Sequence, residues 1–185
     1  FQVLHHFSAT TADTTTGLLE NADGATPLGG LVDGGDGNFY GVTGQGGTDG
    51  NGVIFAMPAD GSTFTVLHSF TGADGARPVA ELLVASSGKL YGATSSGGVN
   101  AEGATTALGT IFSIDRAGTG FARLYSFDGK NGSLPATSLL ETSPGLFVGA
   151  ATSPGNCSYG TLCRYSLAGA RMSATALALP LKSAA

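Results

Sequence analysis

Tryptophan is absent from this chain, and charged residues are scarce. Asp, Glu, Lys and Arg together make up 11% of its 185 residues, whereas an average globular domain carries about twice that share. The eight Lys and Arg residues are scattered and the net charge is −5, so no basic stripe can neutralise nucleic-acid phosphates. No apolar run reaches the roughly 18 residues that a membrane span requires. We therefore predict no nucleic-acid partner and no membrane span.

Catalytic signatures are missing as well. No Gly-x-Ser-x-Gly elbow accompanies a His and an Asp in a suggestive order, and no glycine-rich loop leads into a helix. A hydrolase or lyase would need clustered carboxylates, yet Asp33, Asp36, Glu81 and Asp115 fall at unrelated positions of the repeat described next. The sequence therefore predicts no enzyme activity, no catalytic residue and no cofactor.

Glycine, in contrast, supplies 31 residues and marks three copies of one pattern. The copies span residues 27–70, 78–127 and 135–178, and the second carries a loop insertion at residues 99–108. Each begins with a Pro that is followed four residues later by a Leu: Pro27 and Leu31, Pro78 and Leu82, Pro135 and Leu139. The first two copies share further structural positions: Tyr40, Gly41 and Phe70 match Tyr91, Gly92 and Phe127. A period near 50 residues is typical of a propeller-type array.

The apolar segments between the glycines are short and rich in Phe, Tyr, Val, Ile and Thr, which indicates strands. In the second copy they lie near residues 79–85, 90–95, 110–115 and 121–127. The sequence predicts an all-β fold: a propeller-like array of about three four-stranded antiparallel blades plus an extra N-terminal strand. A β-solenoid would usually repeat at about half this length, and an unrelated β-sandwich would not explain the internal match.

The rest of residues 1–185 fits the same single β-repeat domain. Residues 1–7 resemble the last strand of a copy, residues 64–70, so we predict an orphan closing strand there. Residues 8–26 form a Ser/Thr-rich connection, and residues 179–185 form a tail. The chain starts at Phe1 instead of Met, which fits a secreted protein without its signal peptide, and equally a truncated chain.

Three strings of residues resemble a known family. They are Leu90-Tyr91-Gly92-Ala93-Thr94-Ser95-Ser96-Gly97-Gly98, Gly109-Thr110-Ile111-Phe112 and Val66-Leu67-His68-Ser69-Phe70-Thr71-Gly72-Ala73-Asp74-Gly75. Together they look like the GloVer tandem repeat of bacterial surface and secreted proteins. The third copy is degenerate, since Val148 replaces the Tyr and Ala151 replaces the Thr. The resemblance implies a secreted or anchored propeller-like protein, and it brings no assigned activity and no catalytic residues.

The only two cysteines, Cys157 and Cys163, are six residues apart in the third copy. In an oxidising compartment a disulfide that closes this small loop would be natural, and we predict one. The alternative is a pair of small apolar residues without a bridge. A zinc site would need two more ligands, and no nearby His supplies them.

Two further groups of polar residues can be weighed in the same way. His5 and His68 occupy one repeat position, where the second copy has Tyr125, so a half-buried packing role is expected for them. We find no carboxylate that repeats with them at a fixed spacing, as a catalytic or metal role would require. Asp33, Asp36 and Asn38 carry oxygen ligands of the kind that calcium prefers, but turn formation explains them adequately. We predict no metal site.

An array of three blades has unfinished ends, because stacked repeats need closure or caps. We therefore predict an extracellular or cell-surface structural protein that forms homo-oligomers or polymers, as a ring or a filament, through its N- and C-terminal strands. The alternatives are a fragment of a larger propeller, or a propeller that binds carbohydrate or a cell surface through exposed aromatics such as Tyr40 and Tyr91. A hydrolase or lyase ranks last.

Overall fold

The computed structural model describes residues 1–100, 103–129, 132–153, 161–168 and 171–176. These residues form a small hairpin and three antiparallel sheets of five strands each, and they contain no helix. The hairpin consists of β1 (Thr11–Ala12) and β2 (Leu19–Glu20). Sheet 1 consists of β3 (Ala25–Pro27), β4 (Val32–Asp33), β5 (Asn38–Gln45), β6 (Val53–Pro58) and β7 (Thr65–Ser69).

Sheets 2 and 3 repeat this arrangement. Sheet 2 consists of β8 (Ala76–Pro78), β9 (Leu83–Val84), β10 (Leu90–Ser96), β11 (Thr110–Ile114) and β12 (Ala122–Ser126). Sheet 3 consists of β13 (Ser133–Pro135), β14 (Leu140–Ser143), β15 (Leu146–Ser153), β16 (Thr161–Ala168) and β17 (Arg171–Ala176). The all-β fold with propeller-like blades that the sequence predicts is confirmed.

The first strand of each copy is divided into two short pieces, where a single strand was predicted over residues 79–85. In sheet 2, β8 and β9 both pair with β10, at Thr94↔Pro78 and at Leu90↔Val84. Pro78 has no N–H with which to continue the ladder, so the chain leaves the sheet after it. The detour lets Leu82 turn inward over Gly92, where it is buried.

The last strand also departs from simple alternation. A β-bulge shifts the register between Ile54 and Phe55 in the pairing of β6 with β7, and the same shift recurs between Ile111 and Phe112 in sheet 2. One residue on the partner strand, Leu67 or Leu124, is extra. A bulge reverses the faces of the residues beyond it, so the alternation expected along residues 64–70 does not continue through the strand.

The predicted closing strand at residues 1–7 is wrong. These residues are described but form no ladder with any strand. The physical reason is that β7 and β12 each pair with the third strand of their own sheet, β6 and β11, whereas the described residues provide no such neighbour for residues 1–7. The side chains of the segment still occupy their repeat positions, as the contacts of His5 and Phe7 show below.

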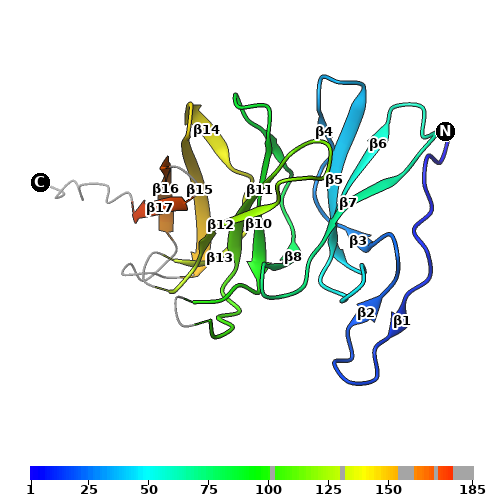
Figure 1. Cartoon of the computed structure of the whole chain (residues 1–185), viewed down its shortest axis with the longest axis horizontal. Helices are drawn as coiled ribbons and strands as arrows, with labels where there is room; N and C mark the ends of the chain where they lie inside the picture. Colours follow the sequence, from blue (N-terminus) through cyan, green and yellow to red (C-terminus); the bar gives the residue numbers. More distant parts are fainter. Residues whose placement is uncertain (101–102, 130–131, 154–160, 169–170, 177–185) are drawn as a thin grey trace, which may run out of the picture.

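The three sheets follow one another along the long axis of the molecule, in chain order, from the N-terminal end to β15–β17 (Figure 1). Successive sheets pack face to face and enclose two hydrophobic cores. The core between sheets 1 and 2 contains Tyr40, Val42, Ile54, Phe70, Leu82, Leu90, Phe112 and Ile114. The core between sheets 2 and 3 contains Tyr91, Ala93, Ile111, Phe127, Leu139, Phe147, Cys163 and Tyr165 among others. Sheet 2 therefore has both faces buried, and all five residues of β11 are buried.

The Ser/Thr-rich connection contains the β1–β2 hairpin. The turn of the hairpin is held by Asp13, whose Oδ1 accepts the N–H groups of Thr15 and Thr16. In Figure 1 the hairpin projects beside sheet 1, close to β3. The backbone N–H of Gly46, at the end of β5, donates to the carbonyl of Leu19 in β2. The hairpin is thereby fixed to one end of sheet 1.

Candidate functional sites

The two histidines of one repeat position each hold a carboxylate. His68 Nε2 lies 2.9 Å from Asp74 Oδ2, and His5 Nε2 lies 3.0 Å from Asp23 Oδ2. Each imidazole ring also stacks on a phenylalanine, with centroids 3.7 Å apart for His68 and Phe121 and 3.8 Å apart for His5 and Phe64. A carboxylate therefore does recur beside these histidines in space, although not at the fixed sequence spacing that a catalytic or metal role would require. The histidine and the carboxylate are 6 residues apart in the His68–Asp74 pair and 18 residues apart in the His5–Asp23 pair. The separations differ because the β1–β2 hairpin lies between His5 and Asp23.

These pairs join consecutive repeats. His68 lies in β7 of sheet 1, while Asp74 precedes β8 and Phe121 precedes β12 of sheet 2, so one imidazole connects the two repeats. Partial burial acts to raise the pKa of the Asp74 carboxyl group. The hydrogen bonds from His68 and from the Thr71 N–H outweigh this effect and hold that pKa below its ordinary value. Within the described residues no group of three or more His, Cys, Asp or Glu side chains can hold a metal ion. The geometry fits a structural clamp.

The acidic turn at Asp33 and Asp36 is engaged in backbone contacts. Asp33 Oδ1 accepts the Gly35 N–H at 2.8 Å, and Asp36 Oδ1 accepts the Asn38 N–H at 3.1 Å. Asp36 Oδ2 also accepts the hydroxyl of Tyr40 at 2.7 Å. These contacts are those of a turn, as the sequence suggests.

The shared structural positions are buried between sheets. Tyr40 packs in the core of sheets 1 and 2, and Tyr91 packs in the core of sheets 2 and 3. Phe70 and Phe127 are fully buried at the ends of the same two copies. The suggestion that Tyr40 and Tyr91 are exposed stacking platforms for sugars is therefore wrong, because a neighbouring sheet covers each ring.

Cys163 is buried on β16, opposite Gly149 of β15. Burial raises the pKa of its thiol, although a hydrogen bond with Tyr165 opposes this shift. Cys157 lies outside the described residues, so the Cys157–Cys163 disulfide stays a prediction.

The outer face of sheet 1 carries an apolar groove of about 290 Å³, lined by residues that include Leu31, Phe55, Met57 and Phe64. Phe7 from the N-terminal segment packs at its side, with its ring centroid 6.0 Å from that of Phe55. The groove corresponds to the face that sheet 2 presents to sheet 1. The opposite end of the array, the outer face of sheet 3, exposes Leu140 and Leu162. Both ends of the stack are therefore apolar.

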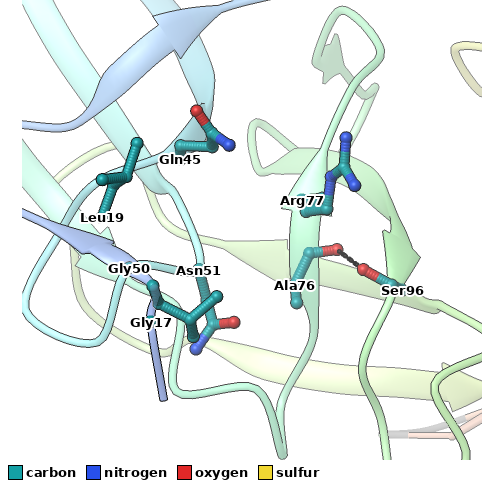
Figure 2. A pocket seen from close by; sticks show the side chains of 9 residues that line it. Gly17, Leu19, Gln45, Gly50, Asn51, Ala76, Arg77 and Ser96 are labelled. Carbon is teal, nitrogen blue, oxygen red and sulfur yellow. Dashed lines mark hydrogen bonds between the residues drawn. The ribbon is translucent and has the colours of Figure 1, made fainter. Parts of the chain in front are cut away.

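A second pocket lies where the β1–β2 hairpin meets the junction of sheets 1 and 2. Its volume is about 240 Å³, and its lining includes Leu19, Gln45, Asn51, Arg77 and Ser96. Figure 2 shows Gln45 and Asn51 on one side, and Arg77, Ala76 and Ser96 on the other. The sequence does not predict this pocket, because its residues come from five separate stretches of the chain that only folding brings together.

A repeat family matches the sequence over almost its whole length. The model of the Gloeobacter/Verrucomicrobia repeat matches residues 1–178. The chain belongs to this repeat family. The GloVer resemblance inferred from the strings of residues in sheets 1 and 2 is thereby confirmed, and membership of a repeat family accounts for the three equivalent sheets. Among curated proteins, none matches the chain. The described residues contain no helix that is long and apolar enough to cross a membrane.

Proposed function

We propose that this repeat protein is a non-enzymatic structural module of the cell exterior that assembles head to tail with further copies of itself. One observation supports the proposal most directly. Leu31, Leu82 and Leu139 occupy the same repeat position, yet Leu31 is 49% exposed while the other two are 3% and 6% exposed. Leu82 and Leu139 are each covered by the sheet that precedes their own, whereas the described residues place no sheet before that of Leu31.

The other end of the array is open at the complementary position. Ile54 and Ile111 are buried at 0% and 1% exposure, and they face the next sheet. Their equivalent in sheet 3 is Leu162, which is 46% exposed. Apolar side chains at positions that are covered in the interior are therefore exposed at both ends of the described array, and patches of this kind mark interaction surfaces.

The interior junctions indicate what fits each open face. Between sheets 1 and 2, Val42 and Ile54 pack with Leu82 and Phe112. The corresponding partners at a junction between two molecules are Ala150 and Leu162 of one copy and Leu31 and Phe55 of the next. Such a contact uses sheet faces, and it leaves the strand edges, on which the sequence-based hypothesis relied, outside the junction.

A contact between two different faces of the same chain is heterologous. It generates a ring if the rotation closes and an open filament if it does not. Two observations support a location outside the cell: the low share of charged residues and the resemblance to a repeat of bacterial surface and secreted proteins.

The test uses charge at each face. Purified chain is analysed by sedimentation velocity and negative-stain microscopy, and we expect species larger than the 18.2 kDa monomer. Leu31→Asp and Leu162→Asp should each abolish the large species, because either change places a carboxylate in an apolar junction. Ser87→Asp, on an exposed turn of the middle sheet, is the matched control and should assemble like the original protein.

Mixing the two variants gives the decisive result. The Leu31→Asp variant keeps an intact Leu162 face, and the Leu162→Asp variant keeps an intact Leu31 groove. These two surfaces can form one junction, so the mixture should form dimers and nothing larger. A monomeric original protein over the accessible concentration range would overturn the proposal, and so would assembly that survives both aspartate variants. Circular dichroism of each variant verifies that it is folded.

A further inference from the structure

We propose that the pocket between the β1–β2 hairpin and the junction of sheets 1 and 2 binds the carboxylate of a small acidic sugar, a uronic acid. The pocket is separate from both end faces, so this inference does not depend on assembly. Among the described residues that line the pocket, Arg77 alone is charged.

The guanidinium of Arg77 is exposed and has no ion-pair partner within the described residues. Other cations of sheet 2 are engaged: Lys89 lies 2.7 Å from Asp115, and Arg123 donates to the carbonyls of Ala73 and Val99. A planar guanidinium matches a carboxylate with two parallel hydrogen bonds. Arg77 is therefore available for an anion.

The backbone of Arg77 holds the side chain at the pocket. Its φ is +54°, and its N–H donates to the carbonyl of Asn51 at 2.9 Å. Thr26 and Leu134, at the same repeat position, also have a positive φ. The unusual conformation thus belongs to the repeat, while the charged side chain belongs to this junction alone.

Gln45 supplies a second donor. Its Oε1 accepts the hydroxyl of Thr26 at 2.9 Å, which orients the amide and leaves the Nε2 hydrogens for a ligand. Leu18 and Leu19 of the hairpin form an apolar wall, against which the C–H face of a sugar ring can pack. Hydrogen-bond donors beside an apolar wall suit a sugar acid better than an inorganic anion.

The junction of sheets 2 and 3 serves as an internal comparison. At the positions of Gln45, Asn51 and Arg77 it has Ser96, Leu108 and Leu134. The same backbone contact is kept there, since the Leu134 N–H donates to the carbonyl of Leu108 at 2.8 Å. The fold therefore does not require polar side chains at the positions of Asn51 and Arg77, and the polar side chains of these two residues at the first junction are not needed to hold the sheets together.

The experiment titrates isotope-labelled protein with glucuronate, with neutral glucose as the control ligand, and follows amide and side-chain NMR signals. We expect glucuronate to shift the signals of Arg77 and Gln45, with millimolar affinity that falls as salt increases. Arg77→Gln should weaken binding by about tenfold or more, as expected for loss of a charge-assisted pair. Arg164→Gln, which removes an exposed arginine from β16, is the matched control and should bind as before.

A polyuronate oligomer identifies the source of the ligand. Tighter binding of the oligomer indicates a polysaccharide, and equal binding indicates the free sugar; either supports the site if Arg77→Gln weakens it. The proposal is overturned if neither ligand shifts the pocket signals, if glucose binds as well as glucuronate, or if Arg77→Gln binds undiminished.

Discussion

At the scale of single residues, the glycine at the centre of each blade acts through its lack of a side chain. Gly92 pairs directly with Phe112 across β10 and β11, and a Cβ added there would lie 2.4 Å from the Phe112 ring and 2.8 Å from Leu82. Gly41 has the same relation to Phe55. The aromatic ring thus lies over the glycine opposite to it, and the Tyr-Gly pair of the sequence records this packing.

We expect Gly92→Ala to destabilise the protein by about 1–3 kcal/mol, because the buried ring of Phe112 must move. Gly149→Ala is the control: its nearest neighbours would lie 3.0 Å and 3.4 Å away, since Cys163 replaces the Phe in sheet 3. Urea denaturation of both variants measures the difference. Equal midpoints for Gly92→Ala and the original protein would contradict this account of the position.

At the scale of elements, identical positions in successive sheets differ in what covers them. Leu31 and Leu82 both lie over the central glycine of their own sheet, but only Leu82 is also covered by a preceding sheet. The interaction between neighbouring sheets is therefore the unit that stabilises the array, as in other repeat proteins.

Leu82→Ala should cost about 2–5 kcal/mol, because it opens a cavity in the core between sheets 1 and 2. Leu31→Ala should cost less than about 1 kcal/mol, since its side chain is half exposed. Both are measured by denaturation in a Leu162→Asp background, which keeps the chain monomeric under the proposed function. Similar losses for the two variants would mean that something covers the groove of sheet 1 in the isolated monomer.

At the scale of the whole molecule, carboxylates that accept hydrogen bonds are distributed over the hairpin and all three sheets. Hydrogen bonds from side chains and from backbone N–H groups hold the pKa of six of them below the ordinary value, against desolvation: Asp13, Asp23, Asp36, Asp60, Asp74 and Glu141. A carboxyl group with a lowered pKa in the folded state stabilises the protein above its ordinary pKa. That stabilisation is lost as the pH falls through the lowered pKa.

We therefore expect the free energy of unfolding to be constant near neutral pH and to decrease once the pH falls below about 4. Asp74→Asn should be less stable at pH 7 and should lose less stability on acidification, because its bonds to His68 and Thr71 no longer depend on a carboxylate. Asp49→Asn should follow the original protein, since the Asp49 carboxylate makes no hydrogen bond in the described part of the chain. Thermal unfolding from pH 7 to pH 3 provides the measurement. Parallel curves for Asp74→Asn and the original protein would refute the assignment.

What the sequence by itself determined is local and periodic. The spacing of Pro, Leu and Gly predicts three equivalent units, and β5, β6, β10 and β11 follow from short apolar segments between glycine turns. These signals suffice because strand and turn preferences act over a few residues, and the period repeats them.

Tertiary structure decided the rest, because those features depend on neighbours through space. The burial of Leu82 in the detour after Pro78 depends on the preceding sheet, and residues 1–7 form no strand because the described residues offer them no partner. The His5–Asp23 pair spans the hairpin, and the Arg77 pocket combines segments that only folding brings together. The exposure of Leu31 and Leu162 is decided in the same way: identical repeat positions are buried or open according to whether another sheet lies against them.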